Sequence, residues 1–252
     1  MLRFPLRLTA DLTMARLARR SRPAFNPVQF VDAAELLHHD SNHPVSHEKI
    51  RELVSGRSPV VWVGGSEPLN HPGTAHLVRA ITGSGHFVFL ETDGTLLRRR
   101  IHEFQPVPRL FLTVRFDAAA QLHASKNLRP RSSELAVEGL RAAQLSGFLI
   151  CVHTRVHAET GLPAIAGLIQ FAHSLDADGI VITSANGGAD AAAVERKTAE
   201  ARKLVGSKWW ESFSRLVERV LNGARTAALS ADDHGVHIEG PAHANEEGVK
   251  VA

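Results

Sequence analysis

The fold of this chain is decided by the stretch VVWVGGSEPLNHP, residues Val60–Pro72. Its four apolar residues, three of them β-branched, are typical of a short buried strand, and the two glycines that follow predict a tight turn. One carboxylate, Glu67, comes directly after that turn. A second strand and turn follow in HFVFLETDG, residues His86–Gly94. The two segments therefore predict neighbouring buried strands that each end in a polar turn.

Six apolar runs of this kind alternate with helix-like stretches along the chain. Each run is short and nearly continuous in apolar residues, as expected for a parallel sheet whose two faces are both covered. Arg115 is the exception, a charge near the end of its strand. The predicted strands are Pro27–Val31, Val60–Val63, Phe87–Leu90, Leu110–Phe116, Phe148–Thr154 and Gly179–Thr183.

Helical spacing and turn residues fit between and after these strands. Strand–helix units with right-handed crossovers form either an open doubly wound sheet or a barrel, and periodicity leaves both open. The last predicted helix has apolar residues at helical spacing, so we expect it to pack on the body of the domain. The predicted helices are Ser46–Gly56, Pro72–Gly83, Glu134–Leu145, Pro163–Leu175, Ala191–Val205 and Lys208–Leu229.

Length and composition indicate one α/β domain between two short terminal segments. The chain has 252 residues, of which 44% are hydrophobic and 22% charged, which is ordinary for a globular protein. No apolar run approaches the roughly 20 residues that a membrane span needs. We expect a basic amphipathic segment over residues 1–24, the globular body over residues 25–229, and a polar, disordered tail over residues 230–252.

Charge and cysteine content narrow the function classes. The net charge is +3 without a compact basic patch carrying interleaved aromatics, so no nucleic-acid partner is expected. The single cysteine, Cys151, excludes an internal disulfide and is compatible with a reducing cytosol, which predicts a cytoplasmic protein. It also excludes an iron–sulfur cluster held wholly by this chain's thiolates. Because Cys151 lies in a predicted strand, we expect a buried core residue rather than a reactive thiol.

The N-terminal segment, Met1–Pro23, is rich in arginine and leucine. Asp11 and the arginines interrupt the continuous apolar centre that a secretory signal requires. We expect a helix packed on the domain's own body. The alternative is an amphipathic helix on an anionic membrane surface, which would place the protein peripherally at the inner face of the membrane.

The two turns resemble the core of the radical S-adenosylmethionine (SAM) superfamily, whose members carry Gly-Gly-Glu-Pro after the second strand and often Thr-Asn-Gly after the third. The matching residues here are Gly65–Pro68, with Ser66 in place of the second glycine, and Thr92–Gly94, with Asp93 in place of asparagine. The opening Arg3–Thr9 is similar to that of the HpnH-like branch. The resemblance covers roughly residues 1–185 and implies a partial (β/α)6 barrel of the TIM-like, radical SAM type.

The resemblance also implies a SAM pocket at the carboxyl ends of the strands. Asp117 and His123 match the Asp and His that the family shows after its fourth strand. Two interpretations of Glu67 are open: it contacts a ligand, or it has a structural role as a cap on a helix or as the partner of an arginine. The candidate ligand-binding residues are Gly64, Gly65, Ser66, Glu67, Pro68, Thr92 and Asp117.

The chain departs from the family where the family binds its [4Fe-4S] cluster. The C-x3-C-x2-C motif falls here on Ala34, His38 and Ser41. Without the cluster, SAM cleavage has no electron source. The sequence therefore predicts no [4Fe-4S] cluster and a pseudoenzyme, an accessory or regulatory binder of SAM or a similar small ligand. Its partner would be an intact radical SAM homologue or another protein.

In the family a C-terminal extension often completes the open side of the barrel, and here we expect that extension to be short or missing. Two other functions remain open. One is a non-radical enzyme that uses SAM or the acid–base groups Glu67, Asp117 and the face shared by His153, Arg155 and His157. That face points into a barrel or lies exposed. The other is a membrane-surface scaffold. The histidines from His38 to His47 suggest a metal site. Their spacing matches no standard ligand pattern, so we expect a polar loop instead.

Overall fold

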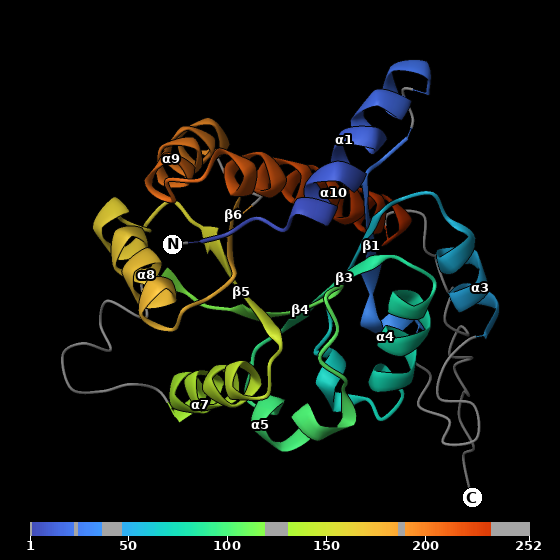
Figure 1. The fold of residues 1–252 in the computed structure, drawn as a ribbon. Helices are drawn as coiled ribbons and strands as arrows, with labels where there is room; N and C mark the ends of the chain where they lie inside the picture. Colours follow the sequence, from blue (N-terminus) through green and yellow to red (C-terminus); the bar gives the residue numbers. More distant parts are fainter. Residues whose placement is uncertain (1, 23–24, 37–46, 119–130, 186–189, 233–252) are drawn as a thin grey trace, which may run out of the picture.

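In the computed structural model the chain forms six parallel strands in sequential order, curled into part of a barrel (Figure 1). The structure describes residues 2–22, 25–36, 47–118, 131–185 and 190–232. All six predicted strands are confirmed, with ends within two residues of the prediction. They are β1 (Val28–Asp32), β2 (Val60–Gly64), β3 (Phe87–Thr92), β4 (Leu110–Arg115), β5 (Leu149–Val156) and β6 (Gly179–Ser184).

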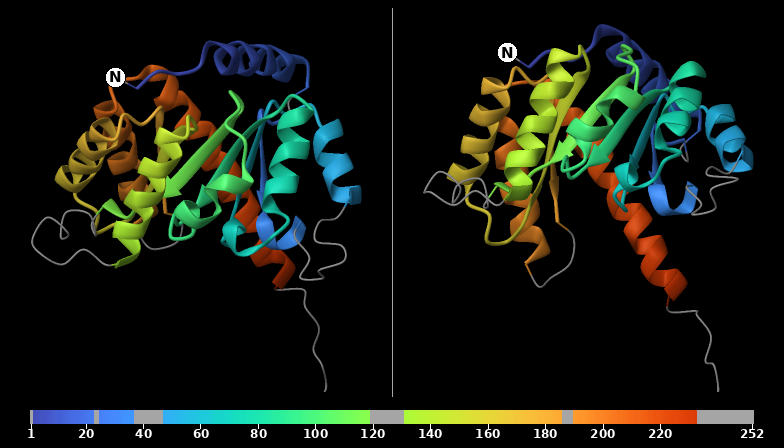
Figure 2. Two further views of the ribbon diagram at one scale, coloured as in Figure 1. Left: turned by 60° about the horizontal axis from the view of Figure 1, so that its bottom comes forward. Right: turned by 90° about the horizontal axis from the view of Figure 1, so that it is seen from below.

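Helices cover the convex outer face of the sheet, as the views in Figures 1 and 2 agree. One of these helices comes after each strand, so that strands and helices alternate along the chain. Right-handed crossovers between parallel strands produce this arrangement. They are α3 (His47–Ser55), α4 (Thr74–Gly83), α5 (Leu97–Arg100), α7 (Arg131–Leu145), α8 (Leu162–Ser174) and α9 (Ala191–Leu204). Short helices α2 (Ala33–Leu36), η1 (Pro68–Asn70) and η2 (Ile101–Glu103) lie in the connections.

The inner face of the sheet carries a row of aromatic rings. The parallel register places Trp62, Phe89 and Phe111 side by side on β2, β3 and β4. The ring centroids of Trp62 and Phe89 are 5.5 Å apart and those of Phe89 and Phe111 4.5 Å, and both pairs are stacked. All three side chains are fully buried. This row fills the barrel interior below the carboxyl ends of the strands.

The last helix, α10 (Lys208–Asp232), closes the open side of the barrel. It contacts both edge strands, β1 and β6, and its Trp210 and Phe213 reach the aromatic row, with Phe213 4.9 Å from Phe89 between ring centroids. The expectation that the closure is short or missing is therefore wrong: one amphipathic helix with large aromatics supplies it. α10 continues to Asp232, so the predicted disordered tail is helical over residues 230–232, and its remainder, residues 233–252, lies outside the described residues.

Helix α1 (Leu6–Ser21) lies across the amino-terminal ends of the strands, at the opposite end of the barrel from the turns after β2 and β3 (Figure 2). Leu8, Leu12 and Ala15 are buried against the body. Phe4, just before the helix, packs edge-on against Trp210 with ring centroids 4.8 Å apart. The expected helix packed on the domain body is confirmed. In the described residues, no helix is both long and apolar enough to cross a membrane.

The docking of α10 can be tested at Gly179. A Cβ at this position would overlap the buried ring of Trp210. We expect Gly179→Ala to lower the free energy of unfolding by about 1–3 kcal/mol, because overpacking a filled core forces side chains and backbone apart. Gly167→Ala in α8 is the matched control, since no heavy atom lies within 4 Å of its Cβ position and alanine favours a helix. Equal denaturant midpoints for Gly179→Ala and the unsubstituted protein would contradict this packing.

Candidate functional site

The turn after β2 depends on its two glycines. Gly65 has φ +77°, and a Cβ there would overlap the carboxylate of Asp32 at the end of β1. A Cβ on Gly64 would lie 2.7 Å from Glu91 Oε2. The backbone N–H of Ser66 donates to Asp32 Oδ1 over 3.2 Å. Because Ser66 has no positive φ, serine is tolerated where the family has its second glycine.

Glu67 ties the end of β2 to the end of β3. Its Oε1 accepts from Leu69 N–H (3.0 Å) and from Thr92 Oγ1 (2.6 Å), and its Oε2 accepts from the N–H of Asp93 (2.8 Å). It is also the N-cap of η1. Glu67 therefore has a structural role, because its two carboxylate oxygens hold the turns after β2 and β3 together.

The structure brings six of the seven sequence-predicted ligand-binding residues together. Residues 64–68 form the turn, and Thr92 joins it through Glu67. Gly65 and Ser66 are exposed, whereas Thr92 and Pro68 are buried. Asp117 lies exposed, two residues past the end of β4. His123 lies outside the described residues.

A buried carboxylate, Glu91, lies at the centre of the inner face beside this turn. Trp62 Nε1 donates to its Oε2 over 2.9 Å, and His153 Nδ1 lies 3.0 Å from its Oε1. Arg115 donates to the same Oε1 over 3.2 Å, and an Arg155 guanidinium nitrogen is 3.8 Å away. Because an ionised carboxylate only accepts hydrogen bonds, His153 Nδ1 carries the proton of this pair. Four strands therefore converge on one side chain.

The electrostatics of Glu91 follow from these contacts. Burial by itself raises the pKa of the Glu91 carboxyl, but the positive charge of His153, hydrogen bonds from His153 and Trp62 and the charge of Arg115 outweigh it. Together they hold the pKa of Glu91 well below its usual range. The group is thus ionised at neutral pH inside the barrel, in an otherwise apolar stretch of β3.

Two guanidinium groups surround this carboxylate on the side of the strand ends. The side chain of Arg115 is 36% exposed and that of Arg155 22% exposed, whereas Glu91 and His153 are fully covered. His153 Nε2 lies 2.9 Å from Thr183 Oγ1, which extends the polar contacts to β6. Both guanidinium groups are permanently charged, and Arg115 is the more exposed of the two. The arrangement can receive an anionic group such as a carboxylate or phosphate.

Sequence reasoning found part of this cluster. The shared face of His153 and Arg155 is confirmed and points into the barrel, while His157 lies exposed beyond the end of β5. Glu91, Trp62 and Asp32 were missed as site residues. The sequence did contain a signal for this cluster: Glu91 and Arg115 are opposite charges near the ends of two largely apolar strands, which predicts that they pair.

The part of the chain that the structure describes was compared with the geometry that a metal site needs. No group of three or more His, Cys, Asp or Glu side chains there is placed to hold a metal ion. His38, His39, Asp40 and His43 lie outside the described residues, so the polar-loop expectation stays a prediction. His47 begins α3 and packs edge-on against His76 at 6.3 Å between ring centroids.

Cys151 is buried in β5, as expected. Burial together with the charge of Asp178 raises the pKa of its thiol well above the usual value.

The Glu91 contacts predict a large cost of truncation. We expect Glu91→Ala to lower the free energy of unfolding by about 3–5 kcal/mol, because His153, Arg115 and the Trp62 N–H lose their buried partner. Glu138→Ala removes the exposed pair with Arg98 instead and is expected to cost about 0–1 kcal/mol. Denaturant titrations of the two variants at neutral pH provide the measurement. Similar losses in both would contradict the assigned role of Glu91.

The pH dependence has a definite sign. Because the folded-state pKa of Glu91 is depressed, its stabilisation is complete above the unfolded-state pKa of about 4.3 and is lost as pH falls towards the folded-state value. Between about pH 5 and pH 3 the unfolding free energy of the unsubstituted protein should therefore fall more steeply than that of Glu91→Ala. Parallel curves would show that this carboxyl is not held ionised by the fold.

Comparison with solved structures shows that the fold of this chain is similar to that of known proteins. No family model and no curated protein matches the chain. Streptococcus suis SuiB bound to S-adenosylmethionine aligns with TM-score 0.51 and 10% identity, over 81% of this chain and 51% of that one. TYW1 with a lysine–pyruvate adduct bound aligns with TM-score 0.44 and 17% identity, over 62% and 53%. Archaeal TYW1 aligns with TM-score 0.40 and 18% identity, over 55% and 47%.

This chain spans about half the length of these solved structures. At 10% identity the SuiB alignment shows the fold alone. It agrees with the partial barrel of the radical SAM type that the two turns implied.

Proposed function

We propose that this chain is a radical-SAM-type partial barrel that works without the family's cluster, as an accessory or regulatory binder of SAM or a similar small ligand. The observation that carries the proposal is one edge of the sheet with three features. It has an exposed glycine turn at Gly65, the carboxylate of Asp32 beside it, and two arginines further along. An intact radical SAM homologue is the partner class that this role fits.

The side chains at the family's cluster positions do not fit a [4Fe-4S] group. Ala34 stands at the first ligand position, in α2, and has no side-chain donor atom; its backbone N–H is bound to Asp32 Oδ1 over 2.9 Å. The chain's single thiol, Cys151, is buried in β5 with a raised pKa, which opposes the thiolate that iron needs. No step of the proposed function passes through a cluster.

The charges at the strand ends fit the amino-acid end of a SAM-like ligand. An α-ammonium group needs acceptors, which Asp32 and the backbone of the glycine turn supply. An α-carboxylate needs donors, which the partly exposed guanidinium of Arg115 supplies as charge-assisted hydrogen bonds. SuiB, whose structure aligns with 81% of this chain, is bound to S-adenosylmethionine. Binding and orientation of such a ligand are what these residues can provide.

A second candidate is acid–base catalysis, favoured by the chain of contacts from Glu91 through His153 to Thr183. A carboxylate that orients a histidine beside a hydroxyl is the arrangement of an activated nucleophile. However, His153 is fully buried and Thr183 is 1% exposed. A substrate would not reach the Thr183 hydroxyl in the described residues. These contacts therefore favour a structural role, in which they hold the barrel strands in place, over a catalytic one.

Calorimetric titration with SAM and with S-adenosylhomocysteine tests the binder. We expect heat of binding with both, and an affinity at least about tenfold weaker in Arg115→Gln, because a hydrogen bond to a charged group contributes about 1.5–3 kcal/mol. Arg98→Gln is the matched control, since Arg98 is exposed on α5 and pairs with Glu138. No heat with either compound, or equal affinities in the two variants, would contradict the proposal.

A further inference from the structure

Helix α1 has a second apolar face that the fold does not use. Leu6, Ala10, Met14 and Leu17 follow helical spacing and are all exposed, opposite the buried anchors of the helix. We call these four residues the outer face of α1. Leu6 is 88% exposed, Met14 66% and Leu17 49%. Isolated exposed leucines are ordinary, whereas a row of them on one helix marks an interaction surface.

An exposed tryptophan extends this patch. Trp209, at the start of α10, is 45% exposed and stacks on Phe4 at 6.0 Å between ring centroids, just before α1 begins. Four of the six large hydrophobic side chains exposed in the described residues therefore lie on or beside α1; the other two are Leu145 and Leu204. Tryptophan is favoured where an apolar phase meets water, as at a membrane interface.

The net charge of the segment is strongly positive. From residue 2 to residue 22 the one acidic side chain is Asp11, whereas the basic side chains are Arg3, Arg7, Arg16, Arg19, Arg20 and Arg22, all of them exposed. On a helical projection Arg7 flanks one side of the outer face, and Arg16 and Arg20 flank the other. An apolar stripe bordered by arginines is the pattern of a helix that lies in the headgroup region of an anionic bilayer.

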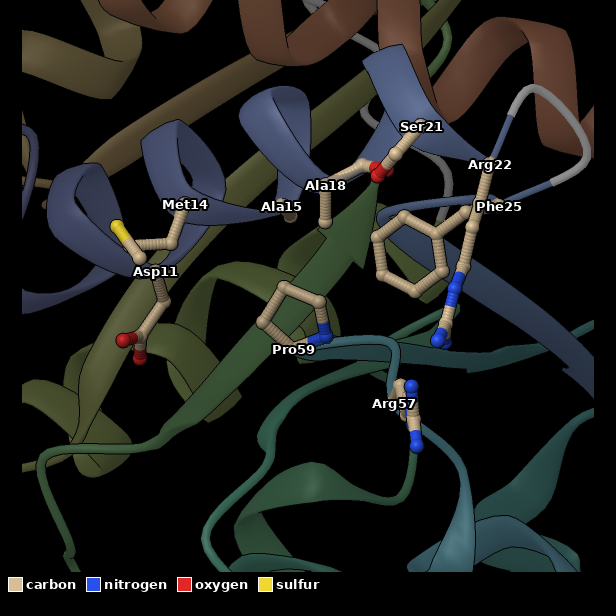
Figure 3. A pocket seen from close by; sticks show the side chains of 9 residues that line it. All are labelled: Asp11, Met14, Ala15, Ala18, Ser21, Arg22, Phe25, Arg57 and Pro59. Carbon is tan, nitrogen blue, oxygen red and sulfur yellow. The ribbon is translucent and has the colours of Figure 1, made fainter.

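A groove beside α1 continues this basic surface into the body (Figure 3). It has a volume of about 520 Å³ and an apolar wall that includes Met14, Ala18 and Phe25. Arg22 and Arg57 lie together at one end of it, and Asp11 lies at the other. The cationic end therefore sits next to an apolar wall, which suits the boundary between a phosphate headgroup and its acyl chain.

We propose that the outer face of α1 docks the protein on an anionic lipid bilayer. A second copy fits this surface poorly, because a two-fold contact would bring the arginines of both copies together. The buried anchors of α1 keep the helix formed without lipid, so little ordering entropy is lost on docking. The turns after β2 and β3 lie at the opposite end of the barrel, so a docked molecule presents its candidate site to the aqueous phase (Figure 2).

Vesicle sedimentation tests this docking with the full chain. We expect partitioning onto vesicles of phosphatidylglycerol and phosphatidylcholine to exceed that onto phosphatidylcholine alone at least tenfold, and to fall as salt rises. The variant R7Q/R16Q/R20Q should lose on the order of a hundredfold in partitioning, since each arginine near such a surface contributes about 1 kcal/mol. The variant L6S/M14S/L17S should lose at least about tenfold, because three apolar side chains no longer enter the interface.

The matched control is L145S/L204S, which removes the exposed leucines of α7 and α9 and should bind as the unsubstituted protein does. Far-UV circular dichroism establishes that each variant is folded. Tryptophan emission gives a second measurement: Trp62 and Trp210 are fully buried, so a blue shift on anionic vesicles should vanish in Trp209→Phe.

Equal binding to neutral and anionic vesicles, no binding to either, or full binding by L6S/M14S/L17S would overturn the docking proposal. So would a concentration-dependent dimer that this variant abolishes, since the face would then serve a second copy. None of these results depends on whether SAM binds at the other end of the barrel.

Discussion

The buried carboxylate of Glu91 is the constraint around which the inner face of the barrel is arranged. Its partners come from β2, β4 and β5, so one side chain on β3 holds the four central strands in register. It also explains why β2 ends in glycine, because a side chain at position 64 would meet this carboxylate. An ionised group in such a place is stable only when its hydrogen bonds are complete.

Aromatic side chains pack the barrel interior below Glu91, and this restricts where a ligand can bind. Trp62, Phe89 and Phe111 occupy the middle of the barrel, and α10 inserts Trp210 and Phe213 from the open side. Helix α1 covers the amino-terminal ends of the strands. The polar groups still accessible on the inner face are therefore at the carboxyl ends, where parallel sheets generally bind their ligands. The proposed ligand site uses that edge, and the aromatic interior is left as a structural core.

The strands and the glycine turn could be predicted from sequence because their signals are local. Continuous β-branched and aromatic runs identify strands, and the alternation along β5 correctly placed His153 and Arg155 on one face. Glu91 could not be recognised as the centre of the site, since its partners lie 24 to 62 positions away and meet only through sheet register. The closure by α10 was missed for the same reason: helical spacing shows that a face is apolar, but not which gap it fills.

The central claim of the proposal is that the sequence lacks the three cysteines of the radical SAM motif, because its one thiol, Cys151, is buried in β5. Mössbauer spectroscopy of the full chain, reconstituted anaerobically with iron and sulfide, tests it most directly. The account predicts no four-iron cluster signal, the same spectrum for Cys151→Ala, and no 5′-deoxyadenosine when the sample is reduced in the presence of SAM. A stoichiometric four-iron cluster, or release of that nucleoside, would contradict the account.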